Sequence, residues 1–164
     1  LTGLLNHRAF HDRIKQEFER YRRYGTCLSL IVADFDDLKH FNDTYGHPVG
    51  DEVLRKIGDI LRETSRETDV LARYGGDEFV ILLPQTNSKN AKNMAERIRV
   101  KVEKFIFTIH DLQLRSTMSI GVATVPDGDI NSPSDLLEFA DRALYEAKRS
   151  GKNRVAVAES FLQK

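Results

Sequence analysis

Apolar residues recur at intervals of three and four in four charged segments of the chain. The first segment, 7–25, ends at a glycine, and the second ends near Ser65. The fourth begins with Ser132, Pro133 and Asp135 at the N-cap, first and third helical positions. The apolar stripes are Phe10, Ile14, Phe18 and Tyr21; Val53, Leu54, Ile57, Ile60 and Leu61; Ala91, Ala95, Ile98 and Val102; and Leu137, Ala140, Leu144 and Ala147. This period predicts four amphipathic helices.

Short β-rich runs separate these helices. The run 27–35 reads as a buried strand, and the chain is then expected to turn through residues 35–51. Residues 69–74 and 78–83 flank a Gly-Gly-Asp corner and predict a tight hairpin. Further strand material is predicted at the ranges 105–111, 112–125 and 154–158.

The order of these elements predicts a fold class. After the first helix it is strand, helix, strand, strand, helix, strand, which is the α+β, ferredoxin-like βαββαβ pattern. The first and third core strands are then antiparallel neighbours in the central sheet. This topology places Asp34, at the end of one, beside Asp77 and Glu78, at the start of the other.

Composition sets the class of protein. The 164 residues, 40% hydrophobic and 30% charged, suit one domain, here 1–164, which we expect to be excised from a longer regulatory protein. Twenty-five basic and 25 acidic residues argue against a sequence-blind nucleic-acid binder, and no apolar run is long enough for a membrane span. The single Cys27 cannot form an internal disulfide, so we expect a buried thiol and a cytoplasmic location.

The carboxylates at this sheet edge suggest metal chemistry. Asp34, Asp77 and Glu78 are hard oxygen ligands, suited to Mg²⁺ or Mn²⁺ ions that also contact substrate phosphates. Gly75 and Gly76 have no Cβ and would let a ligand approach the backbone. The alternative is a plain hairpin turn beside a solvated strand end. Convergence of three acids favours the metal site, because they repel one another without a cation.

Four motifs in order resemble the GGDEF domain family of diguanylate cyclases. They are LTGLLNHRAF, ADFDDLKHFNDTYGHPVGDEVL, RYGGDEF and ADRALYEAKRSGKNRV. The resemblance implies that two GTP condense into cyclic di-GMP across a homodimer, with two Mg²⁺ or Mn²⁺ ions per active site. The rival classes are a catalytically silent receptor for GTP or cyclic di-GMP, and another nucleotide cyclase or polymerase palm with the same fold.

The resemblance implies roles for individual residues. Asp34, Asp77 and the carbonyl of Phe35 would bind metal, and Asp77 or Glu78 would accept the proton of the ribose 3′-OH. Lys39 would stabilise charge on the triphosphate, unless it is an ordinary surface lysine.

The resemblance also implies contacts with GTP. Asn42 and Asp51 would recognise guanine. A carboxylate can pair with the edge of guanine, whereas the edge of adenine would leave it unpaired. His47 would touch substrate or simply occupy a turn. Lys148 and Lys152 would bind phosphate or only complement the end of a helix, and Lys152 stands where the family usually has Arg.

A last motif lies nine residues before Gly75. Arg66-Glu67-Thr68-Asp69 resembles the family's RxxD inhibitory site, where product restrains the enzyme, and Arg97 would complete that site. A surface ion pair between Arg66 and Asp69 is the alternative interpretation.

Overall fold

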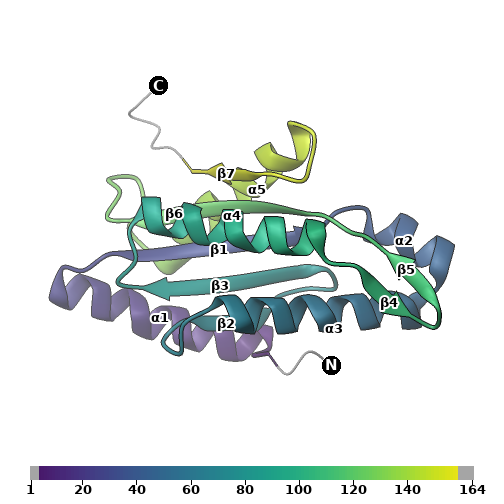
Figure 1. Cartoon of the computed structure of the whole chain (residues 1–164). Coiled ribbons are helices and arrows are strands. Elements are labelled where there is room, and N and C mark those ends of the chain that lie inside the picture. Colours follow the sequence, from purple (N-terminus) through teal and green to yellow (C-terminus); the bar gives the residue numbers. More distant parts are fainter. Residues whose placement is uncertain (1–3, 159–164) are drawn as a thin grey trace.

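A computed structural model describes residues 4–158; the first three residues of the LTGLLNHRAF motif therefore lie outside the described part. Figure 1 shows a central sheet with helices packed across it. In chain order the elements are α1 His7–Tyr24, β1 Leu28–Phe35, α2 Leu38–Tyr45, α3 His47–Thr64, β2 Val70–Arg73, β3 Glu78–Pro84, α4 Ser88–Lys104, β4 Phe107–Ile109, β5 Leu112–Leu114, β6 Met118–Val125, α5 Pro133–Arg149 and β7 Val155–Val157.

The main sheet has the strand order β2-β3-β1-β6-β7. Strand β1 lies at its centre, antiparallel to both β3 and β6, and β7 adds a parallel edge strand. Strands β4 and β5 form a separate two-stranded arm. The predicted ferredoxin-like α+β fold is confirmed, and so is the last strand predicted at 154–158.

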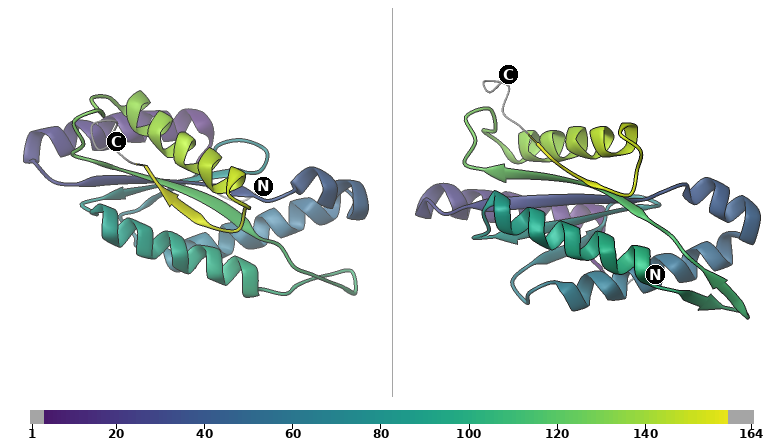
Figure 2. Two further views of the ribbon diagram at one scale, coloured as in Figure 1. Left: turned by 90° about the horizontal axis from the view of Figure 1, so that it is seen from above. Right: turned by 45° about the horizontal axis from the view of Figure 1, so that its top comes forward.

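The core is divided between the two faces of the sheet. Odd-numbered residues of β1, such as Ile31, pack in a cluster with α3 and α4, whereas even-numbered residues, such as Leu30, pack with α1 and α5. Figure 2 shows these helix pairs on opposite faces. An added Cβ at Gly121 on β6 would lie 2.2 Å from the Ala140 carbonyl oxygen, so glycine permits the close approach of α5.

Capping side chains start three of the helices. Asn6 accepts from the Ala9 N–H at 2.8 Å, and Asn87 accepts from the Asn90 N–H at 2.9 Å. Ser132 accepts from the Asp135 N–H at 3.1 Å, as predicted. These bonds satisfy backbone donors that have no partner inside the helix.

Two details of the sequence prediction are wrong. The expected turn at 35–51 contains α2 and the start of α3. Cys27 is only partly buried and precedes β1. The strand material predicted at 112–125 is confirmed as β5 and β6, and in α5 Leu136 is fully buried beside the partly buried Leu137. Among residues 4–158, no helix is both long and apolar enough to cross a bilayer.

Candidate functional site

Asp34 and Glu78 lie directly opposite each other on the paired strands β1 and β3. Side chains alternate between the faces of a sheet, so both follow Leu30 toward the face covered by α1 and α5. The Phe35 N–H donates to the Asp77 carbonyl oxygen at 3.1 Å, which joins the hairpin to the end of β1. The predicted proximity of Asp34 to Asp77 and Glu78 is confirmed.

The hairpin turn is held by its flanking residues. The Tyr74 N–H donates to the Glu78 carbonyl oxygen at 2.8 Å, and the Arg73 guanidinium donates to the Gly76 carbonyl oxygen at 2.5 Å. Gly75 is not among the described residues with positive φ, and neither is Gly76. An added Cβ would meet nothing within 4 Å at Gly76, and only the Glu78 Cβ, at 3.9 Å, at Gly75. The chain's own packing therefore does not require these glycines, whereas a ligand lying on the turn would.

Burial and mutual repulsion perturb the carboxyl groups. Burial raises the pKa of Asp34 to about 6; Lys148 opposes this shift and Asp77 adds to it. Burial also raises the pKa of Glu78 to about 7, with further contributions from Asp141, Asp34 and Asp77. Burial raises the pKa of Asp141 as well. The site thus gathers more negative charge than its own cations neutralise.

Two lysines from the end of α5 neutralise part of this charge. Lys148 forms an ion pair with Asp34 Oδ2, and Lys152 forms one with Asp37 Oδ1. The other oxygen of Asp34, Oδ1, is buried and has no hydrogen-bond partner among residues 4–158. Both lysines therefore already bind anionic oxygens close to the end of β1.

The residues at this edge fit a hard divalent cation. The unpartnered Oδ1 of Asp34 is a free oxygen donor beside the hairpin that carries Asp77. Within the range 4–158, no three His, Cys, Asp or Glu side chains form a complete metal cage. Mg²⁺ commonly takes one or two carboxylates and fills its remaining positions with substrate phosphates and water.

A cavity of about 460 Å³ opens between α2, the start of α3 and the hairpin turn. Lys39, Asn42 and His47 line it together with Gly76 and Asp77; Leu38 and Asp43 complete the lining. This volume suits a small-molecule ligand. The structure therefore brings Lys39, Asn42 and His47 to the same hollow as the signature motif. His47 is the first residue of α3 and does not lie in a turn.

Asp51 is the one expected guanine reader that does not line this cavity. It follows Gly50, where an added Cβ would lie 1.9 Å from the Asn42 Oδ1 atom. Gly50 thus makes room for the Asn42 side chain, whose Oδ1 is buried without a hydrogen-bond partner in the described part of the chain. Asp51 is one residue further along α3, partly buried.

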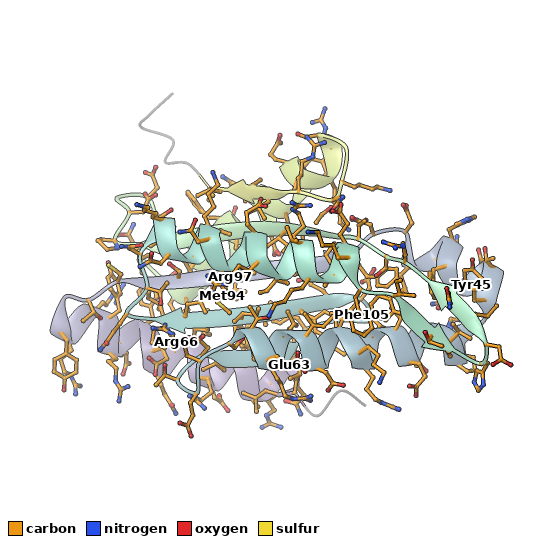
Figure 3. All side chains as sticks on the ribbon, viewed as in Figure 1. Tyr45, Glu63, Arg66, Met94, Arg97 and Phe105 are labelled. Carbon is orange, nitrogen blue, oxygen red and sulfur yellow. The ribbon has the colours of Figure 1, made fainter. Side chains whose placement is uncertain are left out.

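Arg66, Asp69 and Arg97 line a second cavity, of about 280 Å³, remote from the hairpin turn. Figure 3 labels Arg97 and Met94 on α4, and Arg66 two residues after the end of α3. Arg66 makes internal hydrogen bonds to Thr86 Oγ1 at 2.7 Å, to the Pro84 carbonyl at 3.1 Å and to Asp69 at 3.2 Å. The ion pair offered as the alternative interpretation is therefore present. Arg97, on α4, lines the same cavity.

Sequence reasoning missed three residues that shape the site. Asp36 accepts from Thr117 Oγ1 and Ser119 Oγ, both at 2.7 Å, and from the Asn153 N–H at 3.0 Å, and so fastens the segment carrying Lys152 to the end of β1. Asp141, which lies on α5, raises the pKa of Glu78. Arg73 stabilises the turn through its hydrogen bond to the Gly76 carbonyl oxygen. All three residues lie inside the four motifs that resemble the family, and this position was the one signal in the sequence that could have indicated them.

Comparison with known proteins gives a consistent family. The family described as "Diguanylate cyclase, GGDEF domain" matches residues 1–154. The chain is 40% identical to diguanylate cyclase DosC of Escherichia coli over 166 residues, covering 99% of this chain and 35% of that protein. It is 42% identical to the response regulator PleD of Caulobacter vibrioides over 158 residues, covering 94% and 34% respectively.

The fold matches solved structures equally well. The GGDEF domain of DgcB from Caulobacter crescentus, in complex with c-di-GMP, superposes with a TM-score of 0.92 at 36% identity, covering 97% of this chain and 91% of that one. By contrast, the chain spans only about a third of the curated relatives named above. The comparison therefore describes one domain of such proteins.

Proposed function

The chain belongs to the GGDEF domain family, and from this premise we propose that it is a diguanylate cyclase domain, which joins two GTP molecules into cyclic di-GMP and releases pyrophosphate. The observation that carries the proposal is the pairing of Asp34 with Glu78 beside Asp77, at the edge of a cavity of nucleotide size. The intact acids also favour catalysis over a silent receptor.

We assign metal binding to Asp34, Asp77 and the carbonyl of Phe35, with Glu78 as a further candidate ligand. One or two Mg²⁺ or Mn²⁺ ions held there would lower the pKa of the attacking hydroxyl and neutralise charge on the phosphates. The free Oδ1 of Asp34 supports this assignment. Asp77 or Glu78 accepts the proton of the 3′-OH, since both residues belong to the hairpin that lies beside Asp34 Oδ1.

The cavity between α2 and the hairpin binds GTP. Lys39 and Asn42 are three residues apart on one face of α2, so one ligand can contact both. Asn42 and Asp51 recognise guanine, and Lys39 stabilises the charge that develops on the triphosphate. Lys148 and Lys152 contact the phosphates, consistent with the carboxylate oxygens that they bind in this structure.

Each domain binds one GTP, so catalysis requires two domains facing each other. The 3′-OH of each GTP then attacks the α-phosphate of the other, and the two-fold symmetry of the product matches a symmetric homodimer. Cyclic di-GMP also binds at Arg66, Asp69 and Arg97 and inhibits the enzyme. A cavity that brings two arginines together supports this second site, because guanidinium groups pair with phosphate and stack on guanine.

The test uses the domain fused to a leucine zipper that forces dimerisation. Incubation with GTP and Mg²⁺ should yield a product with the mass of cyclic di-GMP, together with pyrophosphate, whereas ATP should not react. Absence of product from the dimerised protein would overturn the proposal. Tight binding of cyclic di-GMP by calorimetry, with no turnover, would instead favour the receptor function.

A further inference from the structure

The cavity proposed to bind GTP, here called the nucleotide cavity, lies on one side of α2, and another cavity lies on the other side. This other cavity, of about 520 Å³, lies between α2, the end of β1 and the arm formed by β4 and β5. Figure 1 shows α2 and this arm at the same end of the molecule, and Figure 3 labels Tyr45 there. His40, Phe41 and Tyr45 of α2 line this cavity, whereas Lys39 and Asn42 line the nucleotide cavity. We call it the rear cavity.

The rear cavity has an aromatic wall. The ring centroids of Phe41 and Tyr45 lie 4.9 Å apart and tilted, and Phe35 meets Phe41 edge to face at 5.4 Å. Phe41 is buried and anchors the wall, whereas Tyr45 is 40% exposed. Such a surface offers offset stacking to another flat ring.

The charged groups of the rear cavity are unevenly paired. Of its three acids, Asp37 binds Lys152 and Glu103 lies 3.6 Å from Arg99, which also pairs with Glu96. Asp36 accepts three hydrogen bonds from uncharged donors. In the described part of the chain, the side chains of its two basic residues, His40 and Arg115, make no ion pair or hydrogen bond. The Arg115 guanidinium is therefore available to an anionic group of a ligand.

Ser116 supplies a further polar group. It is 8% exposed and lies in the cavity wall, and its hydroxyl has no hydrogen-bond partner among the described residues. A buried hydroxyl without a partner costs free energy, and a ligand oxygen that accepts from it would recover that cost. Arg115 lines the same cavity, so one anionic group can contact both residues.

We propose that the rear cavity binds a small planar aromatic anion. The ring stacks on Phe41 and Tyr45, and its carboxylate accepts from the Arg115 guanidinium and the Ser116 hydroxyl. A guanidinium pairs with a carboxylate through two parallel hydrogen bonds, which orients the ring against the aromatic wall.

The position of Asp37 sets the sign of coupling to GTP. This part of the inference rests on the proposed function. Asp37 lines the rear cavity, and its ion-pair partner Lys152 is the proposed phosphate contact. When GTP draws Lys152 away, the unpaired Asp37 carboxylate repels an anion in the rear cavity. The two ligands therefore oppose each other, and each weakens the other by the same factor.

The binding test uses 2-naphthoate as the probe and 2-naphthylmethanol as its neutral counterpart. In two-dimensional amide NMR of the full chain, without nucleotide, 2-naphthoate should shift residues 40–45 and 113–117. Arg115→Gln and the neutral probe should each weaken binding by about tenfold, because each removes one member of the charge pair. Shifts that follow the hairpin turn instead, or equal binding of both probes to both proteins, would overturn the proposal.

The coupling test measures GTP affinity by calorimetry with and without 2-naphthoate. The probe should lower GTP affinity in the wild-type protein, and Asp37→Asn should abolish this effect while retaining 2-naphthoate binding. Because Arg115 lies outside the proposed catalytic site, Arg115→Gln should keep GTP affinity and lose only the response to the probe. Failure to bind GTP at all would contradict the proposed function and leave the NMR result standing. Equal GTP affinity with and without bound probe would overturn the coupling.

Discussion

Lys148 donates a hydrogen bond from its ammonium group to Asp34 Oδ2, joining the last turn of α5 to the end of β1 across 114 residues of sequence. The Asp34 side chain is only 10% exposed, and that of Lys148 is 35% exposed. The lysine opposes the rise in the pKa of Asp34 that burial causes. One cation thus favours the ionised form of a proposed metal ligand and is also the proposed phosphate contact.

Lys148→Met should weaken GTP binding. A hydrogen bond to a charged group contributes about 1.5–3 kcal/mol, so the KM for GTP should rise by about tenfold or more. Initial rates of pyrophosphate release from the dimerised protein measure this. Lys148→Arg keeps the charge and should retain most of the affinity; equal losses in the two variants would show that charge is not the reason.

Asp77→Asn should abolish turnover and leave the fold intact. The substitution removes a proposed metal ligand and base, so kcat should fall by at least about a hundredfold. It also removes a charge that raises the pKa of Asp34 and Glu78, so the melting temperature should stay level or rise. Glu138→Gln, an exposed carboxylate on α5, is the control and should change neither quantity. A clear loss of stability in Asp77→Asn would contradict the reasoning.

Gly76→Ala should separate folding from function. An added Cβ meets no atom within 4 Å, so alanine should fold as well as glycine or stabilise the chain by about 0.5 kcal/mol. If the glycine makes room for nucleotide, GTP turnover should nevertheless drop sharply. Gly128→Ala is the matched control, because its Cβ is equally unobstructed and lies far from the hairpin in sequence. Full activity of Gly76→Ala would remove the argument for a ligand on the turn.

The convergence of Asp34 with the hairpin could be predicted from sequence because topology alone determines it. In a βαββαβ fold the first and third strands are neighbours, and the alternation of side chains puts Asp34 and Glu78 on the same face. Helix α2 could not be predicted so readily. It has eight residues, includes weak helix formers such as Asn42 and Asp43, and lacks a side-chain N-cap.

The electrostatic partners of the site could not be predicted from the sequence either. Asp141 raises the pKa of Glu78 only because α5 lies close to the sheet, and the close approach at Gly121 shows how tight that packing is. Neither the depth nor the angle of this helix follows from its apolar stripe. The internal hydrogen bonds of Arg66 depend in the same way on the path of the chain after β3.

His11 should make stability depend on pH. Burial lowers the pKa of His11 below its ordinary value of 6.5, and nearby His7 and Lys15 lower it further, against an opposing effect of Asp12. His11 Nε2 also lies 2.8 Å from the Tyr74 hydroxyl. The cavity beside them is further lined by the charged residues Glu138, Asp141 and Arg142 of α5.

The sign follows from the protons bound in each state. Near pH 6.5 the unfolded chain binds more protons at His11 than the folded chain does, so His11 by itself makes the free energy of unfolding rise with pH. The raised pKa values of Asp34 and Glu78 contribute a slope of the opposite sign over the same range. Denaturant midpoints between about pH 5 and pH 8 measure the slope. His11→Gln keeps a polar partner for Tyr74 and should remove this rising contribution from the slope, whereas His110→Asn, in the exposed β4–β5 turn, is the control. An unchanged slope in His11→Gln would show that another group is responsible.

Arg97→Ala and Arg66→Ala should differ in stability although both impair product binding. Arg66 holds Asp69, Pro84 and Thr86 together, so its removal leaves the fully buried Asp69 side chain without its cation and should lower the melting temperature. Arg97 makes no ion pair or hydrogen bond in the described range, so alanine there should leave stability unchanged. Arg97 would then act only by contacting the ligand, and Arg97→Ala should lower the affinity for cyclic di-GMP by about tenfold or more.

Calorimetry with cyclic di-GMP and thermal unfolding of both variants test this difference. Lys92→Ala, an exposed position on α4, provides the control for loss of a positive charge. Wild-type affinity in Arg97→Ala, with reduced affinity in Arg66→Ala alone, would mean that the cavity acts only through the fold around Arg66. Loss of affinity in Arg97→Ala at unchanged stability would instead place the product in the cavity itself, since no structural contact of Arg97 is broken.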